Sequence, residues 1–234
     1  MLSIILLTYN NLSATKRCIE ELYRCTSNFD LIIVDNNSTD GTKKYLQQLF
    51  EKHSNTLIEY NIENQGIVKA RNCGYRIAID QAVHPDYIMF MDNDQIVTTG
   101  WWKTYTQLFK QGYDVIGTEA WSLRSDFYPH KKIKDKNDSF SYVGCGGLCI
   151  SKKVAKTVPV IFDEQYYQFF EDPDFIFDIF YNTPFLVGWN YNPVIIHDHK
   201  GPLLTPKTKS YFMKSWEKFQ NKWKDCAPPI FKME

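Results

Sequence analysis

The sequence contains neither of the glycine-rich loops that most often bind nucleotide phosphates in α/β proteins. Among its 234 residues there is no G-x-G-x-x-G segment after a predicted strand and no G-x-x-x-x-G-K-[ST] segment anywhere. Dinucleotide binding by a Rossmann fingerprint and phosphate binding by a P-loop are therefore poorly supported. A chain that binds a diphosphate without such a loop needs a cation to neutralise the phosphate oxygens.

Cysteine pairs with zinc-ligand spacing are also missing. The six cysteines are scattered without a C-x-x-C pair, and Cys145 and Cys149 have no matching second pair. No secretory signal peptide follows Met1, and no apolar run approaches the roughly 18 residues of a membrane-spanning helix. These absences predict a protein of the reducing cytoplasm, without a structural zinc site or a transmembrane helix.

The chain has no net charge, because 27 basic residues balance 27 acidic ones. No overall field therefore attracts nucleic acid, and a nucleic-acid partner is not favoured. The distribution is uneven, since residues 200–234 contain eight lysines against three acids. This basic segment is where we expect an anionic partner, and it could hold the protein peripherally at a membrane surface.

The first half of the chain alternates short apolar runs with helical patterns. Predicted helices begin at Ser13, a candidate N-cap, and extend over 41–50 and 66–79. This alternation is typical of βαβ units and predicts a mainly parallel sheet. The predicted strands that separate the helices are 3–8, 31–34, 57–60 and 87–91.

The second half is less regular. We predict a mobile loop over 120–138, where the sequence is charged and rich in turn formers. Aromatic residues at three- and four-residue spacing predict a helix over 207–224 with one buried face. The other predicted elements are a helix over 100–111 and strands over 113–117, 143–150, 185–188 and 194–197.

Polar residues follow three of the predicted parallel strands. Thr8-Tyr9-Asn10 ends the first strand, Asp35-Asn36-Asn37 ends the second, and Asp92-Asn93-Asp94 ends the fourth. Any one of these clusters could simply form a turn or a helix cap. In an open parallel sheet, however, ligands bind beyond the carboxyl ends of the strands. The coincidence predicts a shared crevice, in which two carboxylates can hold a divalent cation that bridges phosphate oxygens.

Four segments resemble, in the correct order, the motifs of family 2 glycosyltransferases with the GT-A fold. They are SIILLTYNN (3–11), LIIVDNNSTDGT (31–42), NIENQGIVKARNCG (61–74) and YIMFMDNDQIV (87–97). The later segments EDPDF (171–175) and VIIHDH (194–199) resemble that family's downstream elements more loosely. The resemblance extends over most of residues 1–200, and the 31–42 segment is its most specific part.

The resemblance implies a Rossmann-like GT-A α/β fold. A mainly parallel sheet flanked by helices would carry a small mixed sheet on the acceptor side and a C-terminal helix. The glycosyltransferase domain would be 1–205, with a nucleotide-binding half (1–98) and an acceptor-binding half (99–205), and 206–234 would be a helical tail packed on it. The implied activity is an inverting, metal-dependent hexosyl or N-acetylhexosaminyl transfer from a nucleotide-diphosphate sugar, with UDP-sugar favoured, to a surface or lipid-linked glycan.

The resemblance also implies which residues bind the donor. Thr8, Tyr9 and Asn10 would border the nucleotide base, and Asp35 would accept a hydrogen bond from its imide. Without the resemblance, Arg71 could be an ordinary charge on a helix surface and the glycines near 146 could form a strand bulge. The remaining implied donor-binding positions are Asn64, Gly66, Arg71, Asp92, Asn93 and Gly146.

For the metal and the chemistry, the resemblance implies that Asp92 and Asp94 hold Mn²⁺ or Mg²⁺. Either His197 or His199 would complete the site, and the sequence does not choose between them. Glu171-Asp172 resembles the pair in which an acid deprotonates the acceptor, with Asp172 favoured as the base. One base facing a metal-bound leaving diphosphate gives direct displacement and inversion. The alternative for these acids is a solvated helix start.

Three other functions remain open at this point. A sugar-nucleotide nucleotidyltransferase usually has a glycine- and lysine-rich N-terminal loop, which LLTYNNLSATKR does not provide. A non-catalytic binding module is disfavoured by the intact Asp92, Asp94 and Asp172. A protein or modified nucleic-acid base could serve as acceptor through the basic segment 131–136. We further expect that removal of residues beyond about 205 impairs acceptor use or solubility before donor binding.

Overall fold

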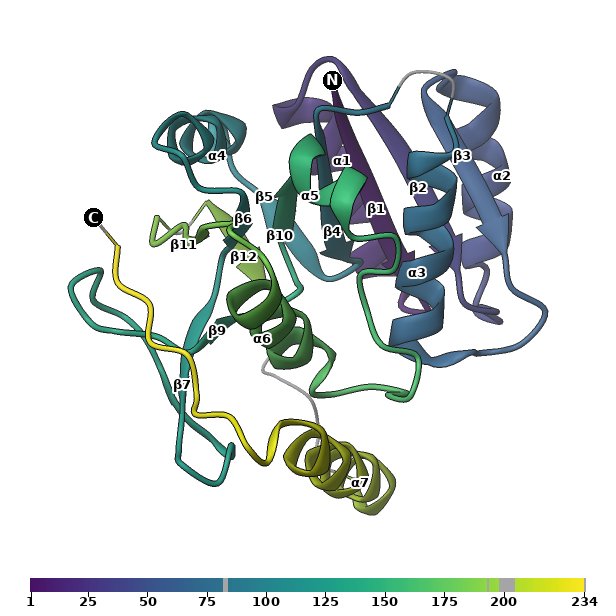
Figure 1. Ribbon diagram of the computed structural model, residues 1–234. Coiled ribbons are helices and arrows are strands. Elements are labelled where there is room, and N and C mark those ends of the chain that lie inside the picture. The colour runs from purple at the N-terminus through teal and green to yellow at the C-terminus, as the bar shows by residue number, and fades with distance from the viewer. Residues whose placement is uncertain (82–83, 193, 198–204, 234) are drawn as a thin grey trace.

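The computed structural model describes residues 1–81, 84–192, 194–197 and 205–233, which form a helix-flanked central sheet (Figure 1). This seven-stranded sheet has the order β11-β6-β10-β4-β1-β2-β3. Its strands are β1 (Leu2–Thr8), β2 (Phe29–Asp35), β3 (Thr56–Tyr60), β4 (Tyr87–Asp92), β6 (Val115–Gly117), β10 (Leu148–Ser151) and β11 (Val187–Trp189).

The sheet is mainly parallel, as the alternating pattern predicts. β1 lies between β2 and β4 and is parallel to both, β3 continues the parallel arrangement, and β10 is antiparallel to β4 and β6. The register pairs Thr8 with Asp35 and Leu7 with Asp92. The polar ends of β1, β2 and β4 therefore lie level along one edge of the sheet.

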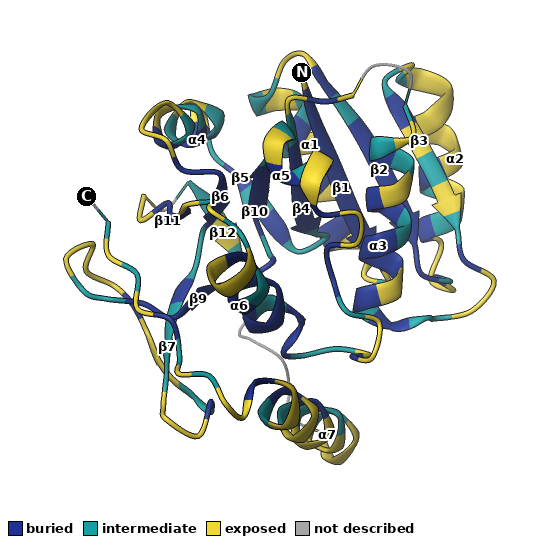
Figure 2. Ribbon diagram, viewed as in Figure 1, coloured by how far each residue is buried: buried dark blue, intermediate teal, exposed yellow. Residues whose placement is uncertain are grey.

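Helices cover both faces of the sheet, because successive side chains of a strand point to opposite faces. From β1, Ile4 and Leu6 belong to one buried cluster and Ile5 belongs to another, and helices contribute side chains to both clusters. The inner strands β1, β2 and β4 are accordingly buried on both sides, whereas the edge strand β3 has exposed residues (Figure 2). The helices are α1 (Leu12–Cys25), α2 (Thr42–Lys52), α3 (Gly66–Ile79), α4 (Trp101–Lys110), α5 (Lys152–Thr157), α6 (Glu171–Asn182) and α7 (Pro206–Trp223).

Two small sheets complete the fold, and both are antiparallel. β5 (Gln95–Val97) pairs with β12 (Ile195–His197), which brings the end of β12 beside the end of β4. The second sheet has the order β8-β7-β9, so the small mixed sheet of the sequence prediction is antiparallel instead. Its strands are β7 (Ala120–Leu123), β8 (Pro129–Lys132) and β9 (Tyr142–Val143).

The prediction of a mobile loop over 120–138 was wrong, because this segment contains the β7–β8 hairpin. Two of its apolar side chains, Phe127 and Ile133, are buried and anchor the charged segment to the core. The predicted N-cap at Ser13 was also wrong. Asn11 caps α1 instead, because its side chain accepts a hydrogen bond from the backbone N–H of Ala14.

The predicted C-terminal helix is present as α7, and one face of it is buried. Phe219 and Trp223 enter the core beside α6, and Trp216 donates a hydrogen bond to the carbonyl of Asp126 in the β7–β8 turn. α7 therefore holds α6 and the hairpin together (Figure 1). No helix of the described residues has the length and apolar composition needed to cross a bilayer.

Asp174 is the main polar contact between α6 and α7. Its buried carboxylate accepts hydrogen bonds from Trp223, Lys222 and Tyr166 at 2.8, 2.7 and 3.2 Å. We expect Asp174→Ala to lower the free energy of unfolding by about 3 kcal/mol, because it leaves buried donors without an acceptor. Asp163 also binds Lys222 but is more exposed, so Asp163→Ala should cost about 1 kcal/mol. Equal losses in urea unfolding would contradict this role for Asp174.

Candidate active site

A cleft of about 460 Å³ lies at the carboxyl ends of β1, β2 and β4. It lies at the sheet edge where the sequence predicts a crevice. Its lining includes seven of the predicted site residues, namely Tyr9, Asn64, Gly66, Asp92, Asn93, Asp94 and His197. Further lining residues, for which no binding role was predicted, are Asn36, Tyr167, Gln168, Lys207, Thr208 and Tyr211.

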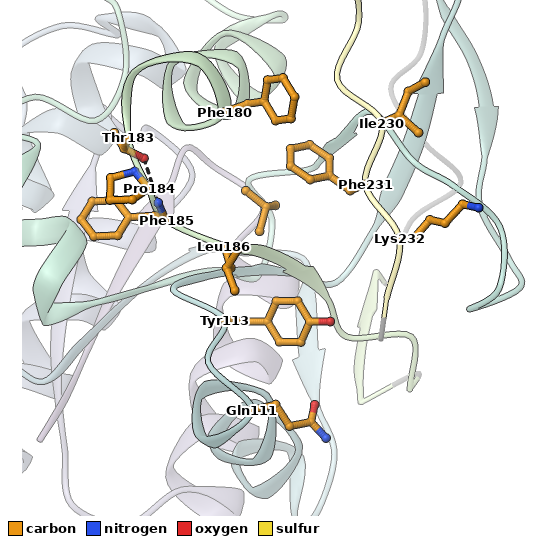
Figure 3. A pocket seen from close by; sticks show the side chains of 11 residues that line it. Gln111, Tyr113, Phe180, Thr183, Pro184, Phe185, Leu186, Ile230, Phe231 and Lys232 are labelled. Atoms are coloured by element: carbon orange, nitrogen blue, oxygen red, sulfur yellow. Dashed lines mark hydrogen bonds between the residues drawn. The ribbon is translucent and has the colours of Figure 1, made fainter.

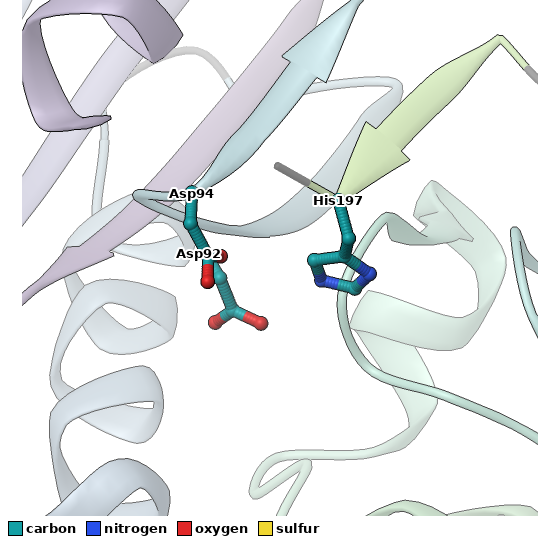
Figure 4. A group of neighbouring side chains, drawn as sticks. All are labelled: Asp92, Asp94 and His197. Carbon is teal, nitrogen blue, oxygen red and sulfur yellow. The ribbon is translucent and has the colours of Figure 1, made fainter. Parts of the chain in front are cut away.

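Asp92, Asp94 and His197 form a cluster in this cleft (Figure 4). One potential ligand atom from each lies within 4.8 Å of the others. Asp92 ends β4, Asp94 lies in the turn that leads to β5, and His197 ends β12, which is paired with β5. The β5–β12 pairing thus brings the histidine to the two carboxylates from a distant part of the chain. His199, the other candidate, lies outside the described residues.

The donor set suits a divalent cation. Two carboxylates and one imidazole are common ligands of Mn²⁺, and the carboxylates also suit Mg²⁺. Gly146 borders the cluster, and a Cβ there would lie 3.1 Å from Oδ2 of Asp92 and 3.2 Å from Cε1 of His197. A side chain at position 146 would therefore crowd the ligand atoms, so the glycine fits a cation site and is more than a strand bulge.

Arg71 is a buried cation behind this cluster. Its guanidinium donates to Oδ1 of Asp92 at 2.8 Å and to Oε1 of Glu171 at 3.1 Å, and it lies 4.0 Å from Oδ1 of Asp172. Only 4 % of Arg71 is exposed, and it is not part of the cleft lining. The alternative that it is an ordinary surface charge is wrong. Its contacts instead join the cation cluster to the Glu171-Asp172 pair.

Glu171 and Asp172 begin α6 and differ in their surroundings. Glu171 is buried and bonded to Arg71, whereas the side chain of Asp172 remains one-quarter exposed. Burial raises the pKa of both carboxyls, while Arg71 opposes that rise. Oδ1 of Asp172 is itself buried, so only the rest of the side chain is accessible. Asp172 is thus the more accessible of the two, with a pKa shifted towards neutrality, as suits a general base.

A small hollow of about 150 Å³ lies directly against Asp172. Ile67 lines both this hollow and the larger cleft. Aromatic rings form much of its wall, and they come from the 169–170 turn, β9 and α7. The lining is Ile67, Pro129, Tyr142, Phe169, Phe170, Glu171, Asp172, Pro173 and Phe212.

Three of the predicted base-binding residues do not line the cleft. Thr8 is fully buried and accepts a hydrogen bond from Asn93. The backbone N–H of Asn10 donates to Oγ of Ser38, and its side chain accepts from the backbone N–H of Thr39. Asp35 is also fully buried, and its Oδ2 accepts from the backbone N–H of Ser38. Its Oδ1 has no partner among the described groups. Only Tyr9 of the first predicted cluster lines the cleft.

Asn36 organises the side of the cleft opposite the cation cluster. Its side chain donates to Oδ1 of Asn64 and the carbonyl of Gly66, and accepts from Asn61 and the backbone of Gln65. This network holds the 61–66 segment against the end of β2. Asn36 belongs to the predicted strand-end cluster Asp35-Asn36-Asn37, although no donor-binding role was predicted for it.

Gly66 is required by close packing as well as by its backbone angle. Its φ is +84°, and a Cβ there would lie 2.6 Å from the carbonyl oxygen of Tyr167. Gly112 has a similar φ of +101° but open space around it. We expect Gly66→Ala to lower the free energy of unfolding by about 2 kcal/mol more than Gly112→Ala, which should cost about 1 kcal/mol. Thermal unfolding of the two variants measures the difference, and equal losses would contradict the packing argument.

The start of α7 belongs to the cleft, which changes the expectation for the C-terminal segment. Tyr211 packs on the ring of Tyr167 at 4.9 Å, and Lys207 lies over Tyr211. Tyr167 in turn donates a hydrogen bond to Oδ1 of Asn64. Removal of residues beyond 205 would therefore alter the wall of this cleft as well as the acceptor side, so loss of acceptor use alone is no longer expected.

A larger hollow of about 610 Å³ lies elsewhere, between the end of α6, β11 and the C-terminal segment (Figure 3). Phe180, Leu186 and Ile230 are exposed around it. Its described lining residues include no carboxylate and no histidine. The chemistry is therefore concentrated in the smaller cleft.

Comparison with known proteins agrees with this geometry. A family model described as glycosyl transferase family 2 matches residues 3–147. The chain belongs to this family. The matched segment runs from β1 to the turn that carries Gly146, and it includes Asp92 and Asp94. The resemblance identified from the sequence motifs is thereby confirmed.

Individual members and solved structures place this family 2 chain further. It is 28 % identical to glycosyltransferase AglE of Haloferax volcanii over 162 residues. The aligned segment is 67 % of this chain and 50 % of AglE. It is 29 % identical over 100 residues to the poly(ribitol-phosphate) beta-glucosyltransferase of Bacillus spizizenii, or 41 % of the chain and 15 % of that enzyme. The chain thus spans about half the length of AglE and a smaller share of the second relative.

The structure of GalNAc-T7 with UDP, GalNAc and Mn²⁺ is similar over 95 % of this chain and 48 % of that one. The TM-score is 0.69 at 12 % identity, so the similarity concerns the fold. It confirms that this family 2 chain has a GT-A fold.

Proposed function

We propose that this protein is a metal-dependent, inverting glycosyltransferase that uses a nucleotide-diphosphate sugar, with UDP-sugar favoured. The observation that carries the proposal is the cluster of Asp92, Asp94 and His197 in a cleft, joined through Arg71 to a candidate base. A cation site and a base lie on opposite sides of the Arg71 guanidinium. This arrangement suits the transfer of a sugar from a leaving diphosphate to the hydroxyl of an acceptor. The family membership of residues 3–147 supports the same activity.

The donor would lie along the 460 Å³ cleft. Its base would meet Tyr9 and the Asn36 network, whose amides offer both donors and acceptors. Asp35 is fully buried behind them, so the contact with the imide of uracil that the resemblance implies would require this carboxylate to become exposed when the donor binds. The diphosphate would then reach Asp92, Asp94 and His197. When bound there, Mn²⁺ or Mg²⁺ supplies the positive charge that stabilises the departing nucleoside diphosphate.

Asp172 would accept the proton of the acceptor hydroxyl while the hydroxyl oxygen forms the new glycosidic bond. Glu171 is a weaker candidate, because it is buried and bonded to Arg71. Arg71 would keep both carboxyls oriented and Asp92 in place. A base on the side of the sugar away from the diphosphate would invert the anomeric carbon in one displacement.

The acceptor would enter through the 150 Å³ hollow beside Asp172. Its aromatic walls suit the apolar face of a sugar ring, and Asp172 lies at its edge. A surface or lipid-linked glycan is the favoured acceptor, and the relative named for poly(ribitol-phosphate) supports that class. Exposed Lys209 and Lys214 on α7 could hold the protein peripherally at an anionic membrane.

Nucleotide release from UDP-sugars in the presence of Mn²⁺ tests the activity. We expect UDP to appear with at least one of UDP-glucose, UDP-galactose, UDP-GlcNAc or UDP-GalNAc, through acceptor transfer or slow hydrolysis, and to stop when EDTA is added. Pyrophosphate release from UTP and a sugar phosphate would favour a nucleotidyltransferase instead. Binding of UDP without turnover of any nucleotide sugar in the presence of a glycan acceptor mixture would favour a binding module.

A further inference from the structure

Glu119 connects the cation cluster to the antiparallel sheet. It lies between β6 and β7, and its Oε1 is 3.2 Å from Nδ1 of His197. The same oxygen accepts a hydrogen bond from Nζ of Lys132 at 2.6 Å. Lys132 ends β8 and is paired in register with Trp121 of β7. One carboxylate thus links His197 to a strand of the β7–β8 hairpin.

The contact with Glu119 determines which ring nitrogen of His197 faces the two carboxylates. One ring nitrogen faces Asp92 and Asp94, and the other points away from them (Figure 4). Because Nδ1 is the nitrogen beside Glu119, Nε2 is the nitrogen directed at the two carboxylates. A neutral imidazole that donates from Nδ1 carries its lone pair on Nε2, and that lone pair is what a metal ligand needs.

We propose that Glu119 is a positioning residue that fixes the ring angle and the tautomer of His197 for cation binding. It accepts Nδ1–H, so that the Nε2 lone pair is presented between Asp92 and Asp94. Lys132 holds Glu119 in place and balances its charge. This inference rests on the metal site of the proposed function and adds to it a dependence on the β7–β8 hairpin, on the acceptor side of the molecule.

The chemistry of the three groups supports this assignment. Metal-binding histidines almost always donate their second ring N–H to a carboxylate, carbonyl or water, which raises the basicity of the ligand. The described partners of Glu119 are two donors, His197 and Lys132, so its carboxylate acts as an acceptor. The segment carrying Glu119 is separated by 78 residues from His197, so the contact depends on the fold.

Mn²⁺ titration followed by the EPR signal of the free ion tests the role without any turnover. We expect Glu119→Ala to weaken Mn²⁺ affinity by about 10- to 100-fold, the usual loss for such a partner. Glu119→Gln keeps an oxygen that can accept from Nδ1–H, and its affinity should lie closer to that of the wild type. The matched control is Asp138→Ala, which removes the partner of Lys131 beside Lys132 and should leave affinity unchanged.

Nitrogen-15 NMR of the metal-free protein, recorded at a pH where the His197 imidazole is neutral, gives a second readout. His197 should be the Nδ1–H tautomer in the wild type, with its signals identified by their loss in His197→Gln, and a tautomer mixture should appear in Glu119→Ala. Wild-type Mn²⁺ affinity in a folded Glu119→Ala protein would overturn the inference. A Glu119→Gln protein that binds Mn²⁺ no more tightly than Glu119→Ala would also overturn it. If the wild type binds no Mn²⁺, the proposed metal-dependent function fails, and the tautomer measurement still tests the positioning role.

Discussion

Asp172→Asn is expected to lower kcat by about 10²- to 10⁴-fold while leaving affinity for the nucleotide and for Mn²⁺ unchanged. The amide has nearly the same shape as the carboxylate but cannot take the proton of the acceptor hydroxyl. Asp172 suits this role because its side chain remains one-quarter exposed and borders the aromatic hollow. Single-turnover kinetics with a saturating donor would separate the chemical step from binding.

The control for this variant is on the same helix. Asp178→Asn alters a partly exposed carboxylate that accepts a hydrogen bond from Asn182, and it should leave kcat unchanged. Near-normal turnover of Asp172→Asn would place the base elsewhere. Glu171 would then be the next candidate, although its bond to Arg71 and its burial make proton exchange with an acceptor harder.

Asp94→Ala is expected to remove the Mn²⁺-dependent part of nucleotide binding. Loss of a residue that only hydrogen-bonds a metal ligand lowers cation affinity by roughly 10- to 100-fold. Loss of a direct ligand such as Asp94 should lower it further. UDP affinity measured calorimetrically with Mn²⁺ should fall to the value that the wild type shows in EDTA. Asp94 contributes no core packing, since it is partly exposed in the cleft, so the variant should unfold at nearly the wild-type temperature.

A matched acidic control lies at the opposite end of the sheet. Asp30 is partly exposed near the start of β2, and Asp30→Ala should change neither UDP affinity nor its dependence on Mn²⁺. If Asp94→Ala binds UDP with Mn²⁺ as tightly as the wild type does, the cation is held by other residues. The cluster would then lose its proposed function.

The parallel part of the fold could be predicted because its signals are local. Each buried strand is an apolar run that ends in polar residues, and each following helix has a buried stripe. The β7–β8 hairpin could not be predicted, since its charged residues hide two apolar anchors, Phe127 and Ile133. β5 was missed because it has only three residues and depends on its pairing with β12.

The candidate site was predictable to the extent that it depends on strand ends. Asp92 and Asp94 lie where the apolar strand and the D-x-D spacing place them. The wall formed by Tyr167 and Tyr211 could not be predicted, because long-range packing alone brings α7 to the 61–66 segment. The burial of Arg71 was likewise hidden, since a helical charge is normally solvated and its three carboxylate neighbours are distant in sequence.

The most direct test is a crystal structure of the protein with UDP and Mn²⁺, with diffraction recorded at the manganese absorption edge. We expect a single anomalous peak between Asp92, Asp94 and His197, in contact with the diphosphate of a UDP molecule whose base lies near Asn36. A manganese peak away from these three side chains, or UDP bound outside this cleft, would contradict the proposal that one cation-bridged diphosphate is the centre of the site.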